Sequence, residues 1–312
     1  MIEIAIMIEG QNGLNWKRWQ SIAHTVEACG YAGLYRSDHY TNANPPDLDS
    51  LECWVSLTWL ASHTNRIEFG PLVSPISFRH PTHTARMAAA VDDLSGGRLT
   101  LGIGAGWQER EHNKYGWDLL AKKDRFDRLE EGLEVITRLL NSDESVEYKG
   151  KYFQLTDAIL LPRPNRPGGP PILIGGNGVM RTLPLVAKYA QEWNALFITP
   201  DELSNLNAKL DGYISLQGRH PDEVKRSLMT GCIFGKDPYQ VEIKVKQRTG
   251  GERTVDDLRK RGVIVGTAAE IIEQCQELAR IGIKRVMLQW LDLDDTAGLE
   301  AMADGILDEL AK

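Results

Sequence analysis

Short apolar runs alternate with longer amphipathic stretches along most of the chain. The first run covers 3–8, and a helical pattern over 16–29 follows it and ends at Gly30, a residue that commonly terminates helices. Further helical patterns cover about 50–62, 81–94 and 124–140. Repeated strand and helix units predict a parallel sheet covered by helices. The expected strands are 3–8, 33–36, 66–70, 99–104, 171–176, 195–197, 228–234 and 285–290.

Three segments interrupt this alternation, and we expect them to be insertions. One contains a hairpin pattern over 147–153 and a proline-rich stretch over 162–171, whereas another is highly charged and suggests a loop with short helices. Eight strand and helix units in 312 residues match an α/β fold, an eight-stranded (β/α) TIM barrel that forms one domain over 1–312. A doubly wound open sheet is the alternative, because periodicity alone does not show whether the sheet closes. The expected insertions are about 105–123, 141–170 and 235–265.

Composition narrows the classes of partner. The net charge of −7 provides no broad attraction to nucleic acid or to acidic membrane surfaces. No apolar run approaches the roughly 20 residues that span a bilayer, and acidic residues interrupt the first apolar stretch. The four cysteines are scattered without a Cys-x-x-Cys pair, and the histidines lack metal-ligand spacing. We therefore expect a cytoplasmic protein that acts on a small molecule, with no metal, nucleic-acid or membrane partner.

Barrel enzymes build their active sites from the loops that follow the strands, and polar residues there are informative. Asp38 and His39 follow the second expected strand. Histidine titrates near neutral pH, so this pair is a candidate for proton transfer. The alternative is an aspartate that caps the next turn and a histidine that forms loop hydrogen bonds. The position at a strand end favours the first interpretation.

Glycine and proline follow the next two strands. The segment 70–75 holds one glycine and two prolines, which indicates either a bulge or unusual peptide bond near a ligand, or a strand that ends early. Gly102, Gly104 and Gly106 alternate after the fourth strand and allow backbone and ligand to approach closely. Their spacing is not the dinucleotide-binding fingerprint, because the third glycine comes two residues after the second instead of three.

A glycine-rich loop also follows the fifth strand and leads into a helical pattern. Its residues are Gly175, Gly176, Asn177 and Gly178. Such a loop presents unpaired backbone N–H groups at a helix N-terminus, which suits a phosphate. The alternative is that these glycines serve the turn alone.

Taken together, these clusters resemble the luciferase-like monooxygenase superfamily, in particular its branch that depends on coenzyme F420, a deazaflavin hydride carrier. Each motif is weak by itself, whereas their order and spacing over nearly the whole chain are specific for the superfamily. The segments that carry the resemblance are 37–40, 71–75, 78–81, 94–98, 102–107, 171–176 and 192–194.

The resemblance implies a barrel, usually a homodimer, with the flavin-like ring over the barrel mouth. It implies a non-prolyl cis peptide near 71–73 behind the ring, and it places His39 where it orients substrate or exchanges a proton. It also implies that the cofactor phosphate lies on the glycine loop after the fifth strand. The implied cofactor-binding residues are Asp38, His39, Leu72, Val73, Ser74, Gly104, Gly106, Gly175, Gly176, Asn177 and Gly178.

The sequence departs from the related sugar-phosphate dehydrogenases at two positions. Those enzymes carry tryptophan where this chain has Ala43, and glutamate where it has Trp107. We therefore expect a substrate other than a sugar phosphate. Glu109, Glu111 and His112 follow closely. They are candidate proton donors, Glu109 foremost, but an exposed acidic run at a helix start is the favoured interpretation for the two glutamates.

The functional hypothesis is an oxidoreductase that transfers a hydride between coenzyme F420 and a small organic substrate, with His39 and Glu109 as catalytic candidates. One alternative is an FMN-dependent monooxygenase with the same fold, and another is a catalytically silent barrel that binds a flavin. We expect the loops over 41–47, 108–118 and 236–251 to set substrate specificity.

Overall fold

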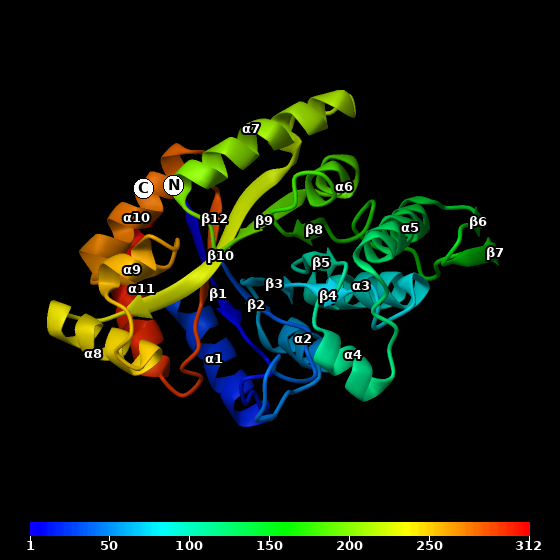
Figure 1. Ribbon diagram of the computed structural model, residues 1–312. Helices are drawn as coiled ribbons and strands as arrows, with labels where there is room; N and C mark the ends of the chain where they lie inside the picture. Colours follow the sequence, from blue (N-terminus) through cyan, green and yellow to red (C-terminus); the bar gives the residue numbers. More distant parts are fainter.

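A ring of parallel strands forms the centre of the computed structural model, which describes residues 1–312 (Figure 1). The strand order is β3-β2-β1-β12-β10-β9-β8-β5-β4, and Phe69 of β3 pairs in parallel with Leu99 just before β5. The two ends of the sheet therefore meet, which confirms a barrel and excludes the open sheet. The strands are β1 (Glu3–Ile8), β2 (Gly33–Arg36), β3 (Glu68–Pro71), β4 (Ser74–Pro75), β5 (Leu101–Gly104), β8 (Ile172–Gly175), β9 (Glu192–Leu196), β10 (Lys225–Phe234) and β12 (Arg285–Gln289).

Helices surround this ring, and local sequence signals fix several of their ends. The side chain of Asn15 caps the first helix by accepting from the backbone N–H of Arg18, and Gly30 ends it with φ of 92°. Pro81 opens another helix at its first position, where a missing N–H costs nothing. None of the helices combines the length and apolar character required to cross a membrane. The helices are α1 (Trp16–Cys29), α2 (Cys53–His63), α3 (Pro81–Ser95), α5 (Lys122–Asn141), α6 (Thr182–Tyr189), α7 (Pro200–Leu216), α10 (Ala268–Arg280) and α11 (Thr296–Leu310).

The remaining elements lie in the segments that interrupt the strand and helix alternation. The antiparallel hairpin is present and projects beside α5 (Figure 1). The charged segment after β10 forms two helices and a short strand that pairs with the far end of β10, and this strand was not expected. These elements are α4 (Glu109–Tyr115), β6 (Val146–Lys149), β7 (Gln154–Ala158), α8 (Pro238–Thr249), α9 (Val255–Arg259) and β11 (Ile264–Gly266).

Charged residues at the N-terminal end of the barrel explain why two strands begin earlier than expected. β9 begins at Glu192 instead of 195, and β10 begins at Lys225 instead of 228. Glu192 is buried there and accepts a hydrogen bond from Arg285 at 3.3 Å. Arg285 also donates to Glu3 at 2.7 Å. Paired charges thus fill the N-terminal end of the barrel. Because these residues are charged, an apolar pattern in the sequence does not reveal that the strands begin there.

The contact between β3–β4 and β5 is too close for a side chain. The peptide bond between Leu72 and Val73 is cis, which confirms the expectation for this segment. A Cβ atom on Gly102 would lie 2.0 Å from the carbonyl oxygen of Pro71, and one on Gly104 would lie 2.6 Å from Cγ2 of Val73. Only glycine fits at these positions, so the alternating glycines of β5 serve barrel closure as well as access to the cavity.

We predict that Gly102→Ala destabilises the fold, because its methyl group would collide with backbone that cannot move aside. The expected loss in free energy of unfolding is about 1–3 kcal/mol, measured by urea unfolding followed by circular dichroism. Gly212→Ala in α7 is the matched control, since a Cβ atom there meets nothing within 4 Å. It should leave stability unchanged or raise it by up to about 1 kcal/mol. Equal stability of the two variants would contradict the packing argument.

Candidate active site

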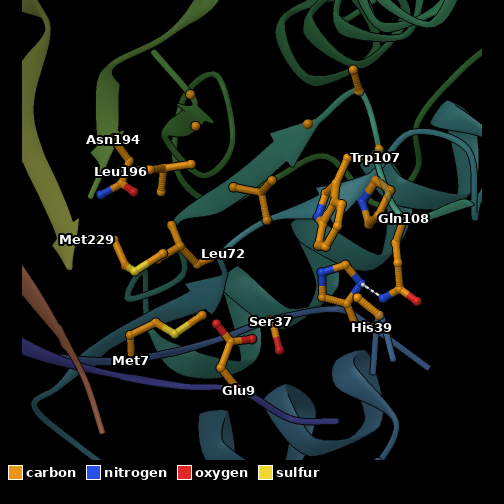
Figure 2. A pocket seen from close by; sticks show the side chains of 18 of the residues that line it. Met7, Glu9, Ser37, His39, Leu72, Trp107, Gln108, Asn194, Leu196 and Met229 are labelled. Atoms are coloured by element: carbon orange, nitrogen blue, oxygen red, sulfur yellow. Dashed lines mark hydrogen bonds between the residues drawn. The ribbon is translucent and has the colours of Figure 1, made fainter. Parts of the chain in front are cut away.

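A cavity of about 730 Å³ opens where the strands end in the loops that follow them. Figure 2 shows apolar side chains from β1, β9, β10 and the segment between β3 and β4 facing into it. This apolar floor suits a flat ring, because it excludes water and offers no competing polar group. The floor consists of Met7, Leu72, Val73, Leu196 and Met229.

His39 lies at the rim of this floor and is held from one side. Its Nδ1 lies 2.8 Å from Oε1 of Glu111, whose other oxygen accepts from the backbone N–H of Tyr40 at 3.0 Å. Gln108 contacts the same ring nitrogen at 3.4 Å (Figure 2). Glu111 is fully buried, and the His39 side chain is 14% exposed. A carboxylate at Nδ1 fixes the proton there in the neutral ring and leaves Nε2, which has no partner in the protein, available to a ligand.

The environment of His39 favours its protonated form. Burial opposes protonation, but the hydrogen bond and the charge of Glu111 outweigh it, so the pKa of His39 is raised above its usual value. A raised pKa means that protonated His39 stabilises the folded state. This contribution is fully present below the pKa of an unfolded histidine and is lost as pH rises through the folded value.

The two positions that depart from the sugar-phosphate dehydrogenases both line the cavity. Trp107 packs edge-on against His39 with ring centroids 5.6 Å apart, and its side chain is 63% exposed. Ala43 also lines the cavity, and its side chain is a single methyl group. These two positions therefore present an aromatic ring and a methyl group to the cavity.

The opposite end of the cavity is basic. Gly175, Gly176 and Thr182 line it at the start of α6, together with Lys122 and Arg125 from the start of α5. Gly176 has φ of 126°, a conformation that residues with a side chain rarely adopt. The backbone N–H of Gly176 donates to the Asn194 carbonyl at 2.9 Å and that of Thr182 to the Gly178 carbonyl at 2.8 Å. The two cationic side chains are therefore the groups that this end offers to an anionic tail.

One buried acceptor in the cavity wall has no partner. Asn194 donates through Nδ2 to Ser227 at 2.9 Å, whereas its Oδ1 is buried without a hydrogen bond. Asn194 lines the cavity, so this oxygen suits a ring N–H group. The apolar floor, this acceptor and the basic end together fit a planar heterocycle with an anionic tail.

The structure brings many of the expected cofactor-binding residues to the cavity but not all. Asp38 instead pairs with Arg79 and accepts from the Ser74 hydroxyl at 2.7 Å, so this carboxylate holds the loop together. Asn177 bridges to both backbone groups of Leu196. The residues that line the cavity are His39, Leu72, Val73, Gly104, Gly106, Gly175 and Gly176, whereas Asp38, Ser74, Asn177, Gly178 and Glu109 do not.

The expectations for the two glutamates of α4 need correction. Glu109 is exposed at the start of the helix and does not line the cavity, whereas Glu111, expected to be exposed, is buried against His39. His112 holds this face of the helix inward, since its Nδ1 contacts the Gln108 carbonyl at 2.7 Å and its Nε2 contacts Ser77 at 2.8 Å. The local acidic pattern does not reveal this burial, because His39 lies 72 residues away in the sequence.

Sequence reasoning also missed several polar residues of the cavity. Glu9 directly follows β1 and Gln289 ends β12, so their strand-end positions were a usable signal. Lys122 and Arg125 lie in the first turn of α5, and Thr182 begins α6. These positions gave no comparable signal in the sequence. The polar lining residues that were not expected are Glu9, Gln11, Asn12, Lys122, Arg125, Thr182, Asn194 and Gln289.

We predict that Glu111→Gln lowers the pKa of His39, because the amide removes the charge that offsets burial while its oxygen still accepts from Tyr40. NMR titration of the imidazole nitrogens measures this value. His80 is the internal control, since burial and the charge of His83 lower its pKa without any contribution from Glu111. An unchanged His39 titration in Glu111→Gln would show that Glu111 does not control it.

Comparison with known proteins agrees with this architecture. The family model described as luciferase-like monooxygenase matches residues 2–249. The 4-hydroxyprotoasukamycin monooxygenase of Streptomyces nodosus subsp. asukaensis is 26% identical over an alignment 317 residues long with gaps. The alignment covers 92% of this chain and 84% of that protein. An F420-dependent glucose-6-phosphate dehydrogenase of Kineococcus radiotolerans is 26% identical over 299 residues, which cover 91% of this chain and 81% of that protein.

A solved structure gives the same overall shape. An F420-dependent secondary alcohol dehydrogenase, in complex with an F420-acetone adduct, superimposes with a TM-score of 0.85 over 98% of both chains at 19% identity. This likeness concerns the fold, whereas the family model spans most of the sequence itself. The chain belongs to the luciferase-like monooxygenase family.

Proposed function

We propose that this protein is an F420-dependent oxidoreductase that transfers a hydride between the deazaflavin and a small organic substrate. The observation that carries the proposal is His39, whose Nδ1 is held by buried Glu111 while Nε2 has no partner at the edge of an apolar floor. Figure 2 shows the ring beside Trp107 and close to this floor. The relative and the solved structure that are named as F420-dependent support this choice of cofactor.

Different residues of the cavity would bind the ring and the anionic tail of such a cofactor. Leu72 and Val73 would support the ring from below, and the Oδ1 of Asn194 would accept from it. The basic end, with Gly175 and Gly176, would hold the anionic tail. When bound, the deazaflavin supplies the hydride chemistry, in which two electrons and one proton move together as H⁻.

His39 supplies the proton chemistry that hydride transfer needs. For an alcohol, Nε2 takes the hydroxyl proton as the carbon loses hydride, and for a ketone it returns that proton to the oxygen. Glu111 stabilises the imidazolium formed in the first case and keeps Nε2 in place in both. The apolar floor and Trp107 limit the water that reaches the reacting atoms. Assembly as a homodimer and a cytoplasmic location remain expectations of the resemblance and of the sequence.

We predict that the purified protein binds coenzyme F420 more tightly than FMN, measured by fluorescence titration with each cofactor. Lys122→Met should weaken F420 binding about 3- to 10-fold at low salt, because Lys122 lines the basic end of the cavity. Its neighbour Lys123 is the matched control, since it is exposed and pairs with Asp127. Tighter binding of FMN would overturn the cofactor assignment and favour the monooxygenase alternative.

We further predict that His39→Ala slows hydride transfer about 10²- to 10⁴-fold, the usual contribution of a positioned acid or base. F420 binding should change less than about threefold, because the apolar floor and the basic end remain intact. The visible absorbance of the deazaflavin reports turnover with a panel of secondary alcohols, aldehydes and ketones. Glu109→Gln is the control and should keep the full rate. Full activity of His39→Ala would remove His39 from the mechanism, and no turnover with any substrate would favour a silent flavin-binding barrel.

A further inference from the structure

One carboxylate at the His39 end of the cavity has no cationic partner. Glu9 lines the cavity directly after β1, and its two oxygens accept from the side-chain amides of Gln289 at 2.7 Å and Gln11 at 2.8 Å. Figure 2 shows Glu9 beside Ser37 on the same side of the cavity as His39. Both donors are neutral, and no lysine, arginine or histidine nitrogen lies within 4.0 Å of the carboxylate. Glu9 is thus held in place without its charge being cancelled.

The other carboxylates near this end are already paired. Protonated His39 is balanced by Glu111, and Asp38 is balanced by Arg79, which also reaches Glu52. If His39 is neutral, Glu111 adds further negative charge. Among these carboxylates and their partners, Glu9 therefore leaves a net negative charge in either protonation state of this histidine.

The nearby cations do not pair with the Glu9 carboxylate. Arg36 packs under Gly10, but it is fully buried and donates to the carbonyl oxygens of Ser37 and Leu51 and to the hydroxyl of Ser56. Arg36 does not line the cavity. Lys122 and Arg125 do line it from the start of α5, and Arg125 donates to the Gly106 carbonyl at 3.1 Å. Glu9 is therefore a cavity carboxylate near His39 that no cation approaches within 4.0 Å.

Trp107 adds a second feature that favours a cation. Its indole ring lines the cavity, is 63% exposed and stands edge-on to His39. The face of an indole attracts ammonium groups, most strongly when the group is desolvated. An uncompensated carboxylate and an exposed indole at one end of a cavity are the two groups that recognise an organic ammonium ion.

We propose that the substrate carries a protonated amine, that Glu9 binds the ammonium group, and that Trp107 packs against it. The substrate class is a small amino alcohol or the corresponding amino ketone, whose oxidisable or reducible carbon then lies beside His39. Anionic substrates are disfavoured, because the carboxylate of Glu9 repels them. The reaction in this assignment rests on the proposed function, whereas recognition of the amine rests on the cavity alone.

Isothermal titration with three ligands of matched shape tests the proposal: benzylamine, benzyl alcohol and benzoate. The protein is titrated at neutral pH and low salt, with and without bound F420. We expect benzylamine to bind at least about tenfold more tightly than benzyl alcohol, a difference of about 1.4 kcal/mol, and benzoate to bind most weakly. The preference should shrink at 1 M salt, where the Debye length is only about 3 Å.

Three variants identify the carboxylate responsible. Glu9→Gln should abolish the preference for benzylamine over benzyl alcohol, whereas Glu109→Gln, which removes an exposed carboxylate outside the cavity, should leave it unchanged. The double variant Glu9→Gln with Gln289→Glu moves the charge to the hydrogen-bonded partner and should restore the preference. Thermal unfolding of each variant checks that it is folded.

The outcomes separate this inference from the proposed function. Equal affinity for the three ligands, a preference that resists salt, or a preference that survives in Glu9→Gln would overturn the role of Glu9. A protein that binds F420 tightly but shows no preference for benzylamine would overturn the amine site alone. A protein that prefers benzylamine but does not bind F420 would overturn the proposed cofactor and leave the amine site in place.

Discussion

The close contact between β3–β4 and β5 is the constraint on which the rest of the site depends. Backbone meets backbone there, since a Cβ atom on Gly70 would lie 2.0 Å from the Thr100 carbonyl oxygen, and Gly102 meets Pro71 equally closely. This approach closes the barrel and presses Val73 against the glycines of β5, which sets the floor of the cavity. It also fixes the loop after β5, which carries Trp107 and, through α4, Glu111 to His39. The scaffold and the chemistry therefore share one set of contacts.

Charge is distributed unevenly between the two ends of the barrel and along the cavity. At the N-terminal ends of the strands, Arg285 gathers several carboxylates into a buried network that holds the structure. At the C-terminal ends, the pair of His39 and Glu111 is buried, while the imidazole ring of His39 stays partly accessible from the cavity. Buried charges are tolerated where they are paired, and a charge left unpaired at a cavity is available to a ligand. This contrast separates the structural network from the groups that meet a substrate.

Local patterns in the sequence predicted eight strands of the barrel, most of the helices and the loops that form the cavity. Helix ends were readable because Gly30 and Pro81 act within one turn of the chain. The burial of Glu111 was not readable, because its partner His39 is distant in sequence and an acidic helix start usually faces water. Asp38 was assigned to the cavity for a similar reason, since only the fold shows that Arg79 occupies its carboxylate. Sequence reasoning thus failed where charged residues pair with partners that are distant in the sequence. It succeeded for the apolar periodicity that builds the barrel.

Membership of a family leaves the substrate open, because the barrel is shared and the loops are not. One relative acts on glucose-6-phosphate, a substrate with two negative charges that a binding site must meet with cations or backbone donors. Here the cations of the cavity come from the start of α5, which the Asp127–Arg181 pair joins to the start of α6, and an anionic cofactor tail would use them. The other end offers Glu9 and Trp107 instead. A phosphate placed there would lose its hydration and face a carboxylate, so the same fold that favours an anion at one end excludes it at the other.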